Sequence, residues 1–246
     1  MRTLYSSAAL ELCYLPGRGD QLVCVFSSIG RGREISRGLP TGNEFIGSVS
    51  GAGSRHVLFI KDNLRSWFSH ESLRDLWVGL ALTVRRMIEP RSVTTLGLSM
   101  GGYAALKFAK LLDADTAVAF SPQFSVDPSV VRDRRWQRFL HNVDMEARPT
   151  VMEEDLGDTK YFALFGGEAN RDRRHAECFM RLPSMQVLLT VNGYHNFPSQ
   201  LKEAGVLDDL IDAAIMGDNL VDRAEFGLLP MAGQEHKRMR ESRKDS

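Results

Sequence analysis

The sequence predicts an α/β fold in which a central, mostly parallel β-sheet is flanked by helices on both faces. Short β-rich runs alternate along the chain with stretches of helical periodicity, which is the pattern of βαβ units. The central runs are continuously apolar instead of alternating, as is typical of strands buried on both faces of a parallel sheet. We expect one such domain over residues 1–230 of the 246-residue chain.

The elements follow one another in a regular order. Seven runs carry the strand pattern, at residues 9–15, 22–28, 56–62, 93–99, 116–122, 161–167 and 186–192. Three helical patterns fit between or after them, at residues 71–90, 101–115 and 199–217. Apolar side chains recur at helical spacing in the first and third of these, and Pro90 ends the first.

Two segments depart from this alternation. Residues 123–158 are charged and lack a long apolar period, which predicts an insertion or small lid over the sheet edge. Four arginines surround Trp136 in this segment, and we expect them on a solvated helix face, with binding of an anionic substrate group as the alternative. These arginines are Arg132, Arg134, Arg135 and Arg138. Residues 231–246 have almost no apolar content, which predicts a disordered tail.

The composition argues against several classes of partner. Lys+Arg and Asp+Glu both number 31, so the zero net charge offers no electrostatic reason to bind nucleic acid. No apolar run reaches about 18 residues, and the first residues lack the long apolar core of a signal peptide, so we expect a cytoplasmic protein without a membrane span. The three cysteines and six histidines show no metal-type spacing, which predicts reduced thiols and no metal site.

The stretch GLSMGG, residues 97–102, places a serine between glycines where a β-branched run gives way to an Ala/Leu-rich helix. The G-x-S-x-G motif of serine nucleophiles requires this strand–turn–helix context. Gly97 and Gly101 remove side chains that would collide across so sharp a turn around Ser99. At the helix N-terminus, the Met100 N–H is a natural donor to a developing oxyanion. The alternative for Ser99 is an ordinary structural turn.

A serine alcohol is a poor nucleophile and needs a base, so an acid and a histidine are expected after later strands. The last predicted strand is followed by NGYH, which supplies His195; its alternative is an ordinary surface histidine. The run at 161–167 is followed by residues that include Glu168 and Asp172. Both carboxylates are candidates for the acid.

With these motifs the chain resembles the α/β-hydrolase superfamily over roughly residues 22–216, and within it small bacterial serine esterases. The resemblance implies that Ser99 is the nucleophile, His195 the general base and Asp172 the carboxylate that orients it. Asp172 is preferred to Glu168 because family members often place the acid a few residues beyond the strand.

The resemblance also implies a second oxyanion donor in the loop after the strand at 22–28. Family members often carry His-Gly there, whereas this chain has FSSIG, so the backbone N–H of Ser28 or Ile29 is the expected donor. No cofactor or metal is implied. The expected activity is that of a carboxylesterase or deacetylase-type esterase, acting through an acyl-enzyme on a small-molecule or glycan ester.

Two other functions fit the same sequence. An acyltransferase would use an alcohol in place of water to release the acyl group. A non-catalytic binding module would be favoured by a Ser99 that is buried or mispaired.

Four further residues carry expectations of their own. His175 is expected to be exposed. Asp62 ends the strand at 56–62 and is expected to cap the next turn. Trp67 and Phe68 either wall the pocket or belong to the core.

Overall fold

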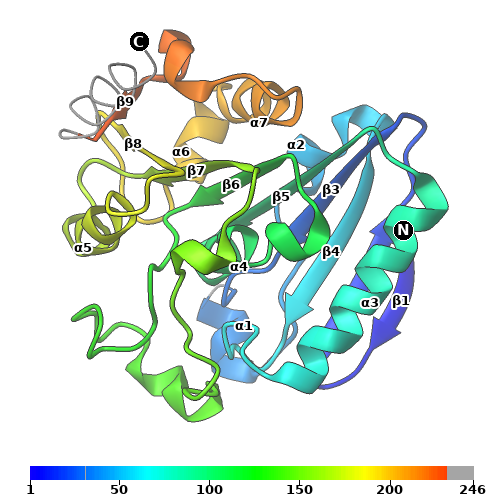
Figure 1. Cartoon of the computed structure of the whole chain (residues 1–246), viewed down its shortest axis with the longest axis horizontal. Helices are drawn as coiled ribbons and strands as arrows, with labels where there is room; N and C mark the ends of the chain where they lie inside the picture. The colour runs from blue at the N-terminus through cyan, green and yellow to red at the C-terminus, as the bar shows by residue number, and fades with distance from the viewer. Residues whose placement is uncertain (31, 232–246) are drawn as a thin grey trace.

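In the computed structural model, which describes residues 1–30 and 32–231, the predicted α/β architecture is present (Figure 1). The described strands form one sheet in the order β1-β2-β4-β3-β5-β6-β7-β8-β9. The strands are β1 (Arg2–Ser6), β2 (Leu10–Leu15), β3 (Gln21–Phe26), β4 (His56–Asp62), β5 (Ser92–Leu98), β6 (Thr116–Phe120), β7 (Lys160–Phe165), β8 (Met185–Thr190) and β9 (Leu228–Pro230). From β4 to β8 all neighbouring strands pair in parallel, and the outer pairs are antiparallel.

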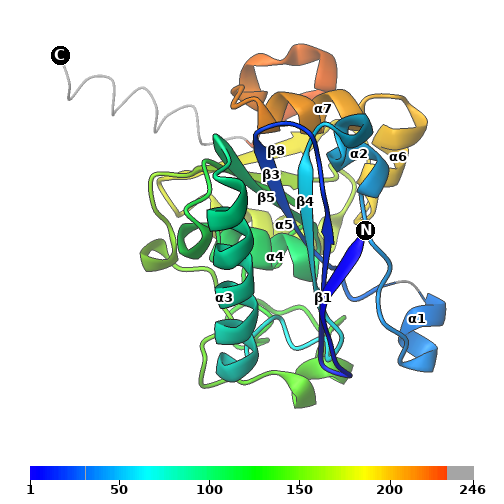
Figure 2. The same ribbon diagram turned by 90° about the vertical axis from the view of Figure 1, so that its right-hand side faces the viewer.

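Helices cover both faces of this sheet. They are α1 (Gly32–Arg37), α2 (Ile46–Val49), α3 (Glu71–Ile88), α4 (Met100–Lys107), α5 (Asn170–Phe179), α6 (Phe197–Glu203) and α7 (Leu207–Ile215). Buried residues of α3, α4 and α5 belong to one core cluster, and those of α2, α6 and α7 belong to another. Figure 2 shows α3 on one side of the sheet and α2 and α6 on the other.

Strand β3 explains why the central runs are continuously apolar. Its residues Leu22, Cys24 and Phe26 pack into the α3–α4–α5 cluster, and Val23 and Val25 pack into the opposite one. Because successive side chains of a strand point to opposite faces, both sets must be apolar when both faces are covered. The prediction of a two-sided buried sheet is confirmed.

The structure departs from the predicted elements at several places. Helices α1 and α2, which lie between β3 and β4, were not predicted, and both are short. The pattern at 199–217 predicted one helix, but Gly205 adopts a φ of +73° and separates α6 from α7. Glycine tolerates this left-handed conformation, so the chain can turn there and lay both helices on the sheet. Strands β1 and β9 were not predicted; both are short and lie at the sheet edges, where a one-sided or exposed strand carries no long apolar run.

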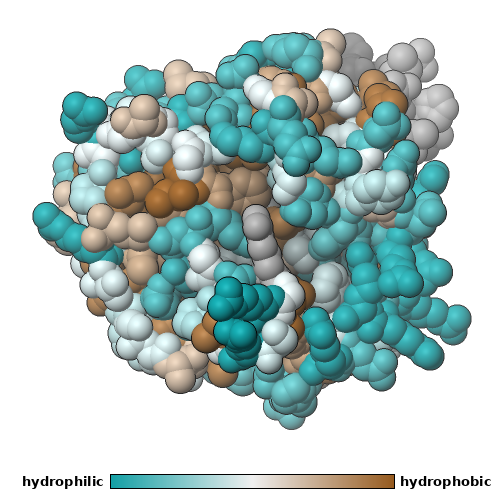
Figure 3. Space-filling view, turned by 180° about the vertical axis from the view of Figure 1, so that it is seen from behind, coloured by the Kyte–Doolittle hydropathy of each residue, from teal (hydrophilic) through white to brown (hydrophobic). Residues whose placement is uncertain are grey.

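The remaining segments are described as far as the structure allows. Residues 123–158 contain two 3-10 helices, Gln137–Asn142 and Glu153–Asp155, and contribute buried apolar side chains to the α3–α4–α5 cluster. Most of the predicted tail, residues 232–246, lies outside the described residues, whereas Met231 is buried and its N–H donates to the Val187 carbonyl. Among the described helices, none combines the length and apolar character that a bilayer crossing needs. The back face of the molecule is largely hydrophilic, and an apolar band crosses part of it (Figure 3).

Candidate active site

Ser99 lies in a strained turn between β5 and α4. Its backbone has φ 58° and ψ −118°, a conformation that residues with a side chain rarely adopt. The turn is held by hydrogen bonds from the Ser99 N–H to the Phe120 carbonyl and from the Tyr103 N–H to the Ser99 carbonyl. A Cβ on Gly97 would lie 2.3 Å from the carbonyl carbon of Gly101, so the collision expected from the sequence is present in the structure.

His195 and Asp172 lie beside Ser99, at the ends of strands that share the same sheet edge. Asp172 is in the first turn of α5, after β7, and His195 follows β8. The Ser99 Oγ lies 3.0 Å from His195 Nε2, and His195 Nδ1 lies 2.7 Å from Asp172 Oδ2. Protonation of Nδ1 makes the imidazole a donor to Asp172 and an acceptor of the serine proton.

The structure pairs His195 with Asp172 and not with Glu168. Asp172 is buried, whereas Glu168 is exposed and bonds to the Tyr194 hydroxyl, which raises the pKa of Tyr194. Burial opposes ionisation of Asp172, but its hydrogen bonds to His195 and Arg135 outweigh this and hold its pKa below the ordinary aspartate value. The carboxylate beside His195 is therefore charged at neutral pH.

Of the four arginines expected on a solvated face, Arg132, Arg134 and Arg138 are exposed, and Arg135 is not. Its guanidinium bridges Asp133 and the second oxygen of Asp172, and its side chain is only 17% exposed. It comes from an irregular segment just before a 3-10 helix, so no regular helix face exists there. The neighbouring Trp136 packs its ring 5.7 Å from the ring of His195.

His175 was expected to be exposed, and this prediction is wrong. The side chain is fully buried; its Nδ1 accepts the Phe124 N–H at 3.0 Å, and its Nε2 donates to Asp133 at 3.2 Å. Burial opposes ionisation of Asp133, yet the hydrogen bonds from His175 and Arg135 hold its pKa well below the usual range. Arg135 thus links Asp172 to the buried pair of Asp133 and His175.

Gln123 was not anticipated from the sequence. It follows β6, the strand next to β5, and its Nε2 donates to Ser99 Oγ at 3.0 Å. Its Oε1 accepts the indole N–H of Trp67 at 3.1 Å. The position of a polar residue directly after a central strand was the one available signal.

Trp67 and Phe68 were expected either to wall the pocket or to belong to the core. Both are buried and belong to the core.

The predicted oxyanion donors lie on either side of Ser99. Met100 is the first residue of α4, where a backbone N–H has no acceptor within the helix. The Ser28 N–H donates to Glu44 Oε2 at 2.8 Å, and the Ser28 hydroxyl donates to Glu44 Oε1 at 2.6 Å. Within residues 1–30 and 32–231, no hydrogen bond occupies the N–H of Met100 or Ile29. Of the two expected second donors, the Ser28 N–H is engaged by Glu44, whereas the Ile29 N–H has no partner among the described residues.

The Ile29 loop is held in place by a buried arginine. Arg65 donates from Nε to the Ile29 carbonyl at 2.9 Å and from Nη2 to the Leu39 carbonyl at 2.7 Å. At the start of the same turn, Asp62 accepts the N–H groups of Ser66 and Phe68, so the predicted cap at Asp62 is confirmed. The turn after β4 therefore positions the loop after β3.

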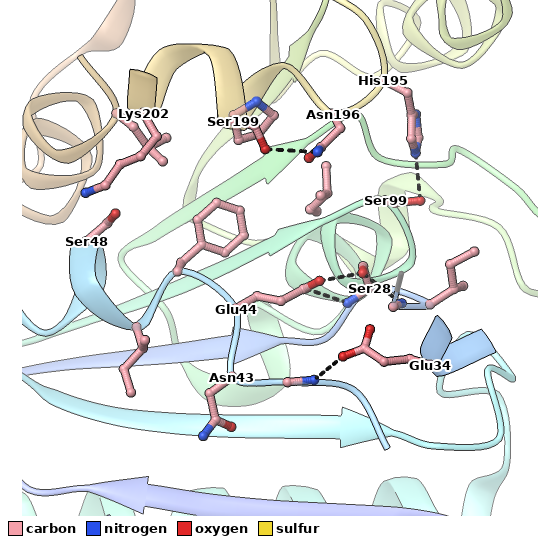
Figure 4. A pocket seen from close by; sticks show the side chains of 18 of the residues that line it. Ser28, Glu34, Asn43, Glu44, Ser48, Ser99, His195, Asn196, Ser199 and Lys202 are labelled. Carbon is pink, nitrogen blue, oxygen red and sulfur yellow. Dashed lines mark hydrogen bonds between the residues drawn. The ribbon is translucent and has the colours of Figure 1, made fainter. Parts of the chain in front are cut away.

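A pocket of about 680 Å³ opens beside Ser99, between the loop after β3, α2 and α6. Figure 4 shows Ser99 and His195 at one end and Ser48 and Lys202 at the other, with Glu44 between them. Although the Ser99 residue is only 3% exposed, it lines this pocket. The site therefore combines a paired serine with room for a ligand.

Known proteins resemble this chain in structure more than in sequence. No protein-family model matches it, and no curated protein matches it by sequence. A capsule O-acetyltransferase of Neisseria meningitidis serogroup A superimposes with a TM-score of 0.60 at 11% identity, covering 85% of this chain and 93% of the other. A fluorophosphonate-binding serine hydrolase of Staphylococcus aureus gives 0.58 at 15% identity, covering 87% and 96%. A carboxylesterase structure from Nitrososphaera gargenis gives 0.51 at 16% identity, covering 88% and 100%.

Proposed function

We propose that this chain, which has the α/β-hydrolase fold, is a serine hydrolase that cleaves carboxylic esters through an acyl-enzyme. The observation that carries the proposal is the continuous hydrogen-bonded series from Ser99 Oγ through His195 to Asp172, at 3.0 and 2.7 Å, beside a pocket. These are the distances over which a general base can accept the proton of a nucleophile. A non-catalytic module was expected to show a buried or mispaired Ser99. The residue is only 3% exposed, but it lines the pocket and is paired with His195, which favours the catalytic alternative.

The geometry supports a two-step reaction. His195 Nε2 takes the proton of Ser99 as Oγ attacks the ester carbonyl, and the charge of Asp172 stabilises the imidazolium. The N–H groups of Met100 and Ile29 face the oxygen that becomes negative. His195 gives its proton to the leaving alcohol, and the acyl group stays on Ser99. Water, deprotonated by His195, then attacks the acyl carbon and releases the acid.

The experiment that tests the proposal is labelling of the purified protein with a fluorophosphonate probe. Wild-type protein should label at one site, and Ser99→Ala and His195→Ala should abolish labelling. Ser184→Ala and His141→Ala are matched controls, because both side chains are exposed on other parts of the surface. If wild-type protein is folded but unlabelled, or if Ser99→Ala labels equally, the proposed activity is wrong.

Transfer of the acyl group to an alcohol other than water is the second candidate. A pocket of about 680 Å³ can hold an acceptor beside an acyl group, and hydroxyl and amide side chains line it, among them Ser48, Asn196 and Ser199. A p-nitrophenyl ester series should be turned over with and without added alcohols or glycans. Acylated acceptor as the main product would indicate a transferase, and free acid as the main product would indicate an esterase.

A further inference from the structure

We propose that Gln123 is a further catalytic residue, whose amide donates to the oxygen of Ser99 and stabilises that oxygen whenever its bond to the acyl carbon forms or breaks. The inference rests on the proposed function, since it concerns the same nucleophile. It assigns a role to the amide that contacts Ser99 Oγ in addition to His195 Nε2.

The direction of the hydrogen bond follows from Trp67. An indole nitrogen can only donate, so the atom of Gln123 that faces Trp67 Nε1 at 3.1 Å must be the amide oxygen. The amide nitrogen therefore faces Ser99 Oγ at 3.0 Å and must donate to it. With this lone pair of Oγ engaged, the serine proton is directed to His195 Nε2.

The pair is built into the core and cannot turn away. Gln123 and Trp67 are both fully buried. Trp67 itself and Ser121, two residues before Gln123, have left-handed backbones, with φ 56° and φ 43°. Residues other than glycine rarely adopt this conformation. Such strain persists where the surrounding structure enforces it, often at a functional site.

The strength of Ser99 Oγ as a hydrogen-bond acceptor for the Gln123 amide changes from one stage of the reaction to the next. In the free enzyme it donates to a hydroxyl oxygen, and during attack it donates to an oxygen that is losing its proton to His195. In the acyl-enzyme, Oγ is the single-bonded oxygen of an ester, which is a weaker acceptor because its lone pair is delocalised into the carbonyl. A buried donor with a poor acceptor is unfavourable, so Gln123 disfavours the acyl-enzyme relative to the steps that flank it.

The same contact assists release of the acyl group. When water has attacked, the bond from the acyl carbon to Oγ breaks, Oγ takes back the proton held by His195, and its strong hydrogen bond from Gln123 is restored. Loss of the donor should therefore slow deacylation and let the acyl-enzyme accumulate. A residue that only filled space beside Ser99 would not alter this partition.

Two substitutions separate donation from packing. Gln123→Met removes the donor at similar volume, and Gln123→Glu keeps the shape and the acceptor for Trp67 but places an acceptor where Ser99 needs a donor. We expect kcat/KM for p-nitrophenyl acetate to fall by roughly 10²–10³-fold in both, as for loss of one oxyanion donor. The exposed Gln137→Met is the matched control and should behave as wild type.

A third substitution tests the orientation without touching the amide. Trp67→Phe removes the indole N–H, so the amide of Gln123 can turn. We expect kcat to fall roughly tenfold, and KM to fall with it as the acyl-enzyme accumulates. Folding of each variant is checked by far-UV circular dichroism, and Trp67→Phe keeps the proposal testable where a Gln123 variant does not fold.

The decisive readout is the acyl-enzyme itself. Rapid-quench mass spectrometry should show an acetyl group on Ser99 accumulating in Gln123→Met, together with a burst of p-nitrophenol. If folded Gln123→Met and Gln123→Glu turn over substrate at the wild-type rate and no acyl-enzyme accumulates, the inference is overturned and the proposed function stays intact. An unlabelled wild-type protein would instead overturn the proposed function.

Discussion

Replacing Gly101 by alanine should both destabilise the protein and disable the site. An added Cβ would lie 2.1 Å from the carbonyl oxygen of Phe26, 2.8 Å from its carbonyl carbon and 2.9 Å from the carbonyl carbon of Ser27. All three atoms are backbone, so none can rotate away. Because carbon contacts are comfortable only at about 3.5 Å, α4 must move away from the end of β3 by roughly 1 Å.

The expected magnitude follows from that displacement. Overpacking of a well-packed interior costs about 1–3 kcal/mol, which is a large part of a stability of about 5–15 kcal/mol. For a domain of this size, each kcal/mol lowers Tm by roughly 2–4 °C. Ser99 precedes α4 and Ser28 follows β3, so the same shift separates Ser99 from the loop after β3. A misplacement of about 1 Å can reduce the rate by about 10²-fold.

The assay is urea unfolding followed by circular dichroism, with the rate of fluorophosphonate labelling measured on the same samples. Gly102→Ala should be intermediate, because its Cβ would lie 3.1 Å from the nearest atom, the Phe120 carbonyl oxygen. Gly79→Ala is the control: nothing lies within 4 Å of its Cβ, and an exposed helical position should gain about 0.5–1 kcal/mol. A Gly101→Ala protein with wild-type unfolding midpoint and labelling would refute the reasoning.

Three further predictions concern the charged groups around the site. Asp172→Asn should lower kcat by about 10⁴-fold because it leaves His195 without its anionic partner. Glu168→Gln should leave steady-state kinetics unchanged. An equal loss of kcat in both variants would contradict the pairing of His195 with Asp172. The pKa values of Asp133 and Asp172 are lowered in the folded state, so the stability they contribute is complete above the unfolded-state pKa of about 4 and is lost as pH falls below it. Arg135→Gln should therefore be less stable than wild type in urea at pH 7, and the difference should shrink at pH 3; a constant difference would argue against the ion-pair network. Arg65→Met should lower the free energy of unfolding by more than about 2 kcal/mol and slow labelling, since it leaves buried loop carbonyls without donors; unchanged labelling would show that the loop holds its shape without Arg65.

The local pattern of the sequence was enough to predict the sheet and to single out Ser99 and His195. Short β-rich runs identified the strands from β2 to β8. The central runs are continuously apolar because a strand covered on both faces must be apolar at every position. The glycines around Ser99 and the position of His195 after a late strand were likewise local features. The glycines could be predicted to flank Ser99 because a sharp turn restricts the residue type at adjacent positions.

Only the tertiary structure decided which side chains meet at Ser99. It brought Gln123 to the serine, Arg135 to Asp172, and Glu44 to the Ser28 N–H. Each of these pairs joins segments that lie on different strands or loops, and no spacing along the chain encodes their contact. The broken helix at Gly205 and the edge strands β1 and β9 escaped prediction for a related reason. Periodicity reports which face of an element is buried, whereas partner choice depends on how the buried faces pack against one another.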